Sequence, residues 1–213
     1  MNKIILTLVL ALGMLTANAQ IKKLAGPRVG VTMISPGSLA SVIRGDVPFF
    51  SNKVREEWTG STGKYGAAIT QYGWQWESRF SDGGEVTGIV EWVALVGGME
   101  KGMFLPSLSS MVGLRTDKGI EFAVGPNLSL GGIAMVFGAG YNFKFGELNV
   151  PVNITYVPSM NKNYHHDAEY DYVELYDEDG NNIGYNEVVT PEYTVTHPTG
   201  ARISVMVGFN LGK

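Results

Sequence analysis

The chain has 213 residues, of which 45% are hydrophobic and 17% charged, and its formal net charge is -4 at pH 7. This length suits one modest domain, and a mildly acidic chain without a basic stripe interleaved with aromatics gives nucleic-acid binding no support. The sequence holds no cysteine. Neither a disulfide framework nor a lipid-attachment cysteine is therefore available, and stability must come from backbone pairing and packing.

The first segment predicts an export signal. Asn2 and Lys3 precede an apolar run from Ile4 to Leu15, and the following Ala17-Asn18-Ala19 has the A-x-A form of a cleavage site. The run is shorter than the about 20 apolar residues that a membrane-spanning helix needs. We expect residues 1–19 to be a cleaved signal peptide and residues 20–213 to form one exported domain.

Eight later segments alternate apolar and polar residues with a period of two, which is the pattern of strands with one apolar face. All their charged side chains fall on the polar parity, where many glycines also lie. On the apolar parity are large aromatics such as Trp74 and Trp76, which suit lipid headgroups better than a packed core. The expected strands are Arg28–Ile34, Ala67–Phe80, Gly84–Val96, Met103–Arg115, Gly119–Leu130, Ile133–Phe145, Leu148–Tyr156 and Ala201–Leu211.

The connections alternate in length. Turn residues join three pairs of strands at Ser81–Gly83, Thr116–Lys118 and Gly146, whereas Ser35–Gly66 and Ser159–Gly200 are long. If the N-terminus lies in the periplasm, the three turns are periplasmic and both long loops face outward, as in outer-membrane barrels. The fold expected is therefore all-β: an eight-stranded antiparallel up-and-down transmembrane β-barrel with short periplasmic turns and two long outer loops.

In this pattern the chain resembles the small outer-membrane β-barrel proteins of Gram-negative bacteria, with their OmpA/OmpX-like architecture, from about Gly26 to its end. The resemblance implies a place in the outer membrane, contact with outer-membrane lipid and insertion by the barrel-assembly machinery. Such proteins commonly end on an aromatic residue, whereas here Gly212 and Lys213 follow Phe209 and Leu211.

The expected lumen carries nearly balanced charge. A barrel of about eight strands has room inside only for side chains or one small ligand, and buried charges must pair or keep water. Two interpretations stay open: an internal ion-pair ladder that fills the lumen and blocks conduction, or polar groups that line water. The inward-facing charged residues are Arg28, Arg79, Arg115, Lys144 and Arg202 with Glu77, Glu85, Glu91 and Glu121.

The first long loop carries the aromatics Phe49, Phe50 and Trp58. Exposed aromatics can anchor an extracellular partner or lie on the lipid surface. The simpler interpretation, which we favour, is that they pack over the barrel mouth or belong to strand extensions.

The second long loop is strongly acidic, with Lys162 as its single Lys or Arg. Alternating Tyr170, Tyr172 and Tyr176, followed by Asp177–Asn181, predict a hairpin that extends the barrel wall above the membrane. A calcium loop is not favoured at Asp177-Glu178-Asp179-Gly180, because the glycine comes too early and no glutamate closes the loop.

All three histidines, His165, His166 and His197, lie in this second loop. Adjacent residues on a strand point to opposite faces, so His165 and His166 would not converge on a metal or a substrate without a turn. We expect no catalytic residue, no metal and no cofactor.

These features favour a structural or surface-interaction, adhesive role without enzymatic activity. One alternative is a secreted lipocalin-like barrel that binds an apolar ligand, but its outward parity should be rich in Lys and Glu. A second alternative is a small outer-membrane lipid-modifying enzyme, which needs a convergent Ser/His/Asp or Asp/His set that the sequence does not show.

Overall fold

A computed structural model describes residues 24–46 and 63–211. The described residues fall into two compact units. Within the described residues, the barrel unit contains residues 24–33, Ala68–Pro158 and residues 202–211, and the loop unit contains residues 34–46 and 63–67 together with Ser159–Ala201. The expected signal peptide and the aromatics Phe49, Phe50 and Trp58 lie outside the described residues.

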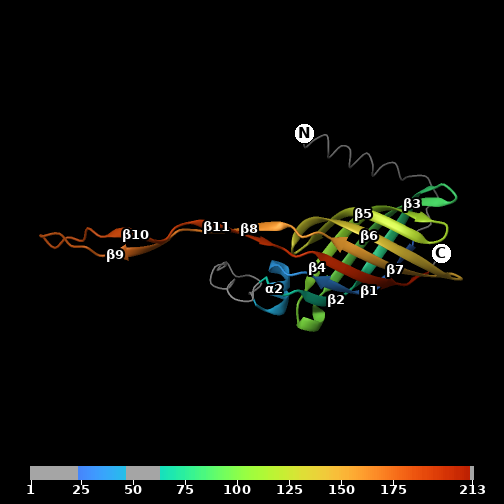
Figure 1. The fold of residues 1–213 in the computed structure, drawn as a ribbon, viewed down its shortest axis with the longest axis horizontal. Coiled ribbons are helices and arrows are strands. Elements are labelled where there is room, and N and C mark those ends of the chain that lie inside the picture. The colour runs from blue at the N-terminus through green and yellow to red at the C-terminus, as the bar shows by residue number, and fades with distance from the viewer. Residues whose placement is uncertain (1–23, 47–62, 212–213) are drawn as a thin grey trace. The chain divides into compact units, whose positions relative to one another are not determined.

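Eight antiparallel strands close into a barrel, which confirms the all-β, eight-stranded prediction (Figure 1). The last strand pairs with both the first and the seventh, so the sheet has no free edge. This last strand is interrupted at Phe209, whose backbone N–H donates to the carbonyl of Pro27. The strands are β1 (Leu24–Ile34), β2 (Ala67–Asp82), β3 (Val86–Gly97), β4 (Leu105–Thr116), β5 (Ile120–Ser129), β6 (Gly132–Phe145), β7 (Leu148–Val157), and the last strand as β12 (Arg202–Gly208) and β13 (Asn210–Leu211).

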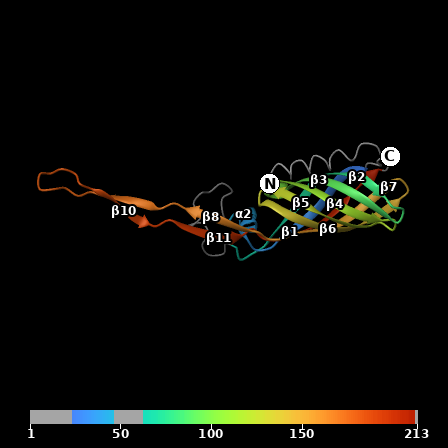
Figure 2. The ribbon, with the colours of Figure 1, turned by 90° about the horizontal axis from the view of Figure 1, so that it is seen from above.

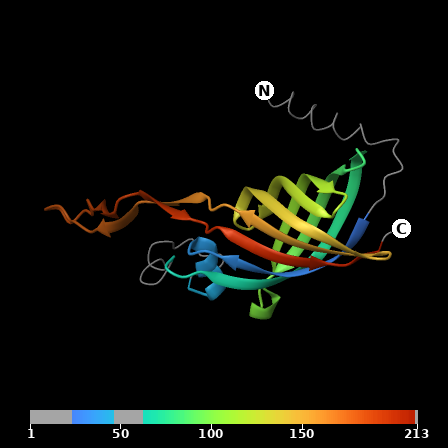
Figure 3. The ribbon, with the colours of Figure 1, turned by 45° about the vertical axis from the view of Figure 1, so that its right-hand side comes forward.

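Tight turns give the barrel its up-and-down order. Gly84, Gly119 and Gly146 have φ values of 80°, 94° and 64° in the turns β2–β3, β4–β5 and β6–β7, which glycine adopts without steric cost. At the other end of the barrel, the 3-10 helix η1 (Met99–Lys101) joins β3 to β4, and a two-residue turn joins β5 to β6. The three short turns predicted from the sequence are thus confirmed. Figure 3 shows the strands tilted and twisted around a common axis.

Side-chain alternation assigns the two faces of the wall as the sequence predicts. In β2, Gln75 and Glu77 are buried inside, whereas Trp74 and Trp76 between and beside them are exposed outside. Outward positions of the other strands repeat this pattern, and a one-residue register slip would exchange the two faces. The exposed apolar residues include Val31, Met33, Tyr72, Trp92, Phe104, Leu114, Phe122, Leu128, Phe137, Phe143, Ile154, Tyr156, Ile203 and Phe209.

The loop unit consists of a short helix and a long ribbon. The helix α2 (Ser38–Arg44) buries Ala40 and Ile43 and ends at Gly45 in the left-handed conformation. The ribbon has two hairpin segments in succession, as Figures 1 and 2 show: β8 (Asn161–His166) pairs with β11 (Tyr193–Pro198), and β9 (Glu169–Val173) pairs with β10 (Tyr185–Thr190). The hairpin predicted from the alternating tyrosines is confirmed.

Across the part of the chain that the structure describes, no helix combines the length and apolar character required to cross a membrane.

Candidate functional site

The strongest charged contact in the barrel is a three-residue cluster from three strands. Arg115 of β4 is held by Glu77 of β2 and Glu121 of β5, and its Nη1 donates to Glu77 Oε1 at 2.5 Å. Its Nη2 donates to the second Glu77 oxygen and its Nε to Glu121 Oε1. The exposed fractions of the three residues are 5%, 2% and 3%. A bidentate guanidinium is the geometry that best compensates buried carboxylates.

A second network joins Arg28 to Glu91 through a neutral residue. Arg28 Nε donates to Gln75 Oε1 at 2.8 Å, and Gln75 Nε2 donates to Glu91 Oε1 at 2.6 Å. Arg28 Nη1 also donates to Asn210 Oδ1 at 2.9 Å. Gly208 leaves room for this guanidinium, because a Cβ there would lie 1.9 Å from Arg28 Nη1.

The two networks meet where two buried carboxylates of like charge face each other. Glu77 and Glu91 are directly opposite each other on β2 and β3, and like charges in this position repel. Arg115 compensates Glu77 directly, whereas Glu91 forms no ion pair with any described Arg or Lys and is supported by Gln75. The charged side chains thus form two local networks instead of one continuous ladder.

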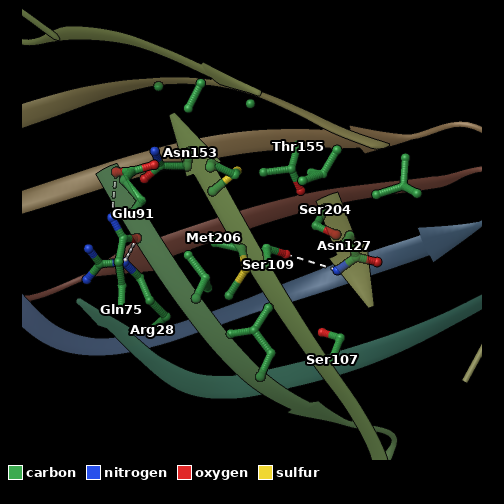
Figure 4. Close-up of a pocket in the computed structure, with 18 of the residues that line it drawn as sticks. Arg28, Gln75, Glu91, Ser107, Ser109, Asn127, Asn153, Thr155, Ser204 and Met206 are labelled. Carbon is green, nitrogen blue, oxygen red and sulfur yellow. Dashed lines mark hydrogen bonds between the residues drawn. The ribbon is translucent and has the colours of Figure 1, made fainter. Parts of the chain in front are cut away.

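A cavity of about 70 Å³ occupies the barrel interior beside these networks (Figure 4). Figure 4 shows Arg28, Gln75 and Glu91 grouped at one side, with Ser109 and Asn127 at the other. Asn127 Nδ2 donates to Ser109 Oγ at 2.9 Å. Apolar side chains narrow the same space: Val93, Met111, Val136 and Val157 form a buried cluster. A volume of this size has room for a few water molecules and not for a wide aqueous channel.

The remaining lumen candidates differ in their distance from the two networks. Arg79 Nε is 3.8 Å from Glu77 Oε1, with the Arg79 side chain 26% exposed. Arg202 lines the cavity and donates from Nη1 to Ser129 Oγ at 2.8 Å. Two expectations are corrected. Glu85 precedes the first residue of β3 and is exposed, and Lys144 lies one residue before the end of β6 and is also exposed. Neither is enclosed in the lumen, because the strands no longer surround these positions.

Sequence reasoning missed Gln75, Asn210 and Ser109, which are neutral. The sequence nevertheless indicates their inward orientation, because each has the same parity as a charged lumen residue of its strand. A search restricted to charged residues could not find a bridge made by an amide.

The tyrosines of the ribbon lie at exposed positions. Tyr170 and Tyr172 share one face of β9, opposite Val188 and Asn186 of β10, and are 61% and 51% exposed. Tyr176 lies beyond the strand in an isolated bridge with Asn182. The other face of β9–β10 is acidic, with Asp171 directly opposite Glu187.

The ribbon's tip is organised by one carboxylate. Asp177 Oδ1 accepts the backbone N–H of Asn181 at 2.7 Å and of Asp179 at 3.0 Å, while Asn181 Nδ2 donates to Oδ2 at 3.0 Å. Hydrogen bonds from the side chain and backbone of Asn181 lower the pKa of Asp177 below its ordinary value. The carboxylate therefore serves the tight turn that the sequence favoured over a calcium loop.

The three histidines do not converge. His166 stacks on Tyr193 with ring centroids 4.9 Å apart, whereas His165 contacts the Thr194 hydroxyl at 3.2 Å. His197 is opposite Lys162 on β11 and β8, and burial lowers the pKa of its imidazole. Within residues 24–46 and 63–211, no three His, Cys, Asp or Glu side chains are grouped so that they could hold a metal ion.

The fold defines a small, closed, eight-stranded antiparallel β-barrel protein. Compared with models of known protein families and with curated proteins, the sequence matches none.

Proposed function

We propose that this protein is an outer-membrane β-barrel of a Gram-negative bacterium with an OmpA/OmpX-like architecture and a structural, surface-interaction role. The observation that carries this proposal is the inversion of the barrel's polarity. The outward positions of the eight strands are predominantly apolar and many are exposed, whereas Arg28, Glu77, Glu91, Arg115 and Glu121 are buried inside. Monomeric soluble proteins rarely expose a continuous apolar surface of such extent, and lipid is the solvent that suits it.

The same inversion weighs against the secreted lipocalin-like barrel. A barrel that binds an apolar ligand in water needs an apolar lumen and a charged exterior. Here the cavity lining combines apolar side chains such as Val93 and Met111 with the charged Arg28 and Glu91, and outward positions in mid-strand carry aromatics such as Trp74 and Phe122. An apolar ligand would meet buried charge inside this barrel.

The proposed barrel does not conduct ions. The Glu77–Arg115–Glu121 cluster and the apolar cluster around Met111 both occupy the lumen, and the cavity left between side chains is about 70 Å³. This arrangement supports the interpretation of a filled lumen over that of a water-lined pore.

The surface role is supported by the loop unit and not by any catalytic arrangement. The ribbon exposes Tyr170, Tyr172 and Tyr176, and aromatic side chains are enriched at protein interfaces. The described histidines point apart, so they supply nothing that favours the lipid-modifying enzyme. In this proposal a cleaved signal peptide exports the chain and the barrel-assembly machinery inserts it.

Fractionation of cells followed by gel electrophoresis without and with boiling tests the proposal. We expect the protein in the outer-membrane fraction, and we expect the unheated sample to migrate differently from the boiled one because the closed barrel stays folded in detergent. Recovery in the soluble periplasm would overturn the membrane location, since the exposed apolar wall would then face water.

A further inference from the structure

Negative charge is concentrated on the ribbon far beyond its share of the chain. Residues 159–200 hold one lysine and nine carboxylates, a formal charge of -8, whereas the whole chain carries -4. The rest of the chain is therefore formally positive, at +4. The nine acidic residues are Asp167, Glu169, Asp171, Glu174, Asp177, Glu178, Asp179, Glu187 and Glu192.

The β9–β10 segment sorts its side chains onto two different faces. Tyr170 and Tyr172 lie with Val188 on one face, which we call the tyrosine face. Asp171 and Glu187 lie directly opposite each other on the other, which we call the carboxylate face. Neither Asp171 nor Glu187 forms an ion pair within the described chain, and Asp171 is supported by the backbone N–H of Tyr172, which donates to its Oδ1 at 2.9 Å. No cation of the described chain therefore offsets the repulsion between the two carboxylates.

The backbone of this segment is open to a further strand. The β9–β10 sheet has only two strands among the described residues, so each strand has one edge without a strand neighbour. Strand β10 carries a bulge between Val188 and Thr190, whereas β9 is regular over Glu169–Val173. A regular edge is the better template for an added strand, because a bulge twists the edge away.

We propose that the edge of β9 is the docking site for an extended, Lys/Arg-rich segment of a partner protein, added as a third strand. This inference rests on the surface role proposed above and specifies the partner. Successive side chains of an added strand point to opposite faces of the sheet. Basic residues at alternate positions would therefore meet the carboxylate face, and the apolar or aromatic residues between them would meet the tyrosine face.

Charge selects this partner over other occupants. A second copy of the chain would bring a further -8 to the same surface, and an anionic lipid or polysaccharide would be repelled in the same way. A basic segment docked on β9 places its cations beside Asp171 and lowers the negative potential at Glu187, and its backbone pairs with the open edge.

Peptide binding to the purified full-length protein in detergent micelles tests the inference. The probe is a fluorescent peptide of about ten residues in which Lys and Val alternate. One control peptide has the same composition with its lysines grouped together, and a second alternates Glu and Val. We expect the alternating Lys peptide to bind at least about tenfold more tightly than the Glu peptide and to weaken as salt is raised.

Two protein variants locate the site. Combining Asp171→Asn with Glu187→Gln should weaken the alternating Lys peptide about fivefold, because the charge pair beside the added strand and the negative potential of the more distant Glu187 are both lost. The pair is expected to fold, since removing opposed like charges relieves repulsion. Combining Glu85→Gln with Glu147→Gln removes the same charge from exposed residues outside the ribbon and should leave binding unchanged.

The outcomes separate this inference from the proposed function. Equal binding of the Lys and Glu peptides, or equal loss of binding in both double variants, would overturn docking at β9. The membrane location would be unaffected, because cell fractionation tests it separately. Equal binding of the alternating and grouped Lys peptides would overturn strand addition. Self-association in light scattering that the Asp171/Glu187 variant abolishes would assign the site to a second copy and would also overturn it.

Discussion

The barrel wall and the ribbon use the same period-two alternation and reach opposite results. In the wall, each strand has two neighbours and the carboxylates of Glu77, Glu91 and Glu121 are buried inside. In the ribbon, each strand has one neighbour and both faces are exposed, so Asp171 and Glu187 stay on the surface. Sheet closure, more than local sequence, decides whether an alternating strand hides or displays its polar residues.

The largest expected effect is on the barrel wall, where removing the central guanidinium of the lumen should destabilise the fold. Arg115→Ala leaves Glu77 and Glu121 buried without their cation, which we expect to cost about 3–5 kcal/mol in the free energy of unfolding. Urea unfolding in lipid vesicles, followed by tryptophan fluorescence, measures the loss. Arg79→Ala removes the more distant cation of Glu77, whose Nε is 3.8 Å from Glu77 Oε1 and whose side chain is 26% exposed; it should cost less than about 1 kcal/mol. Equal losses would contradict a role for the cluster.

Placing the same charge on each region compares their surroundings directly. Val124 on the wall and Val188 on the ribbon are 41% and 50% exposed. If the wall faces lipid, Val124→Arg should destabilise the barrel by about 2–4 kcal/mol, whereas Val188→Arg should change stability by less than about 0.5 kcal/mol. The unfolding assay in vesicles applies to both variants. If Val124→Arg left the free energy of unfolding unchanged, water and not lipid would surround the wall.

Cutting the amide bridge should have an intermediate effect. Gln75→Leu removes the acceptor of Arg28 Nε and the donor to Glu91 Oε1, and unsatisfied buried groups cost about 1–3 kcal/mol. Ser78→Ala on the same strand is the matched control, with an expected change within about 0.5 kcal/mol. Thermal unfolding followed by circular dichroism distinguishes the two, and no difference between them would argue against the bridge.

The smallest effect is expected at the ribbon's tip and depends on pH. Because the folded turn lowers the pKa of Asp177 below its ordinary value of 3.8, the carboxylate stabilises the turn fully above that value. This stabilisation is lost as the pH falls through the lower, folded pKa. The amide NMR signals of Asp179 and Asn181 should report the change while barrel amides do not. Asp177→Asn should abolish this titration and Asp179→Asn should leave it; the reverse result would assign the turn to the wrong carboxylate.

The strands and their faces could be predicted because a half-buried strand imposes a strict alternation, and an error of one residue would reverse every side chain. The positions at which the enclosed lumen ends could not be predicted from the sequence. Glu85 and Lys144 have the parity of buried residues, yet parity does not show where neighbouring strands stop surrounding a position. The meeting of Glu77 with Arg115 was also unpredictable in detail, because the stagger between β2 and β4 depends on the closed barrel. The strands β8 and β11 were not predicted, because residues 159–200 were interpreted as a long loop with one hairpin.

The double pairing of the C-terminal strand ties completion of the fold to completion of the chain. Until Arg202–Gly208 is available, β1 and β7 each lack a neighbour, and the partial sheet has two adhesive borders. A chain released early, or one whose final strand is damaged, would hold a curved and open sheet that no later local adjustment can seal. Addition of this last strand to the sheet is therefore the step that closes the cylinder and covers the exposed edges of both β1 and β7.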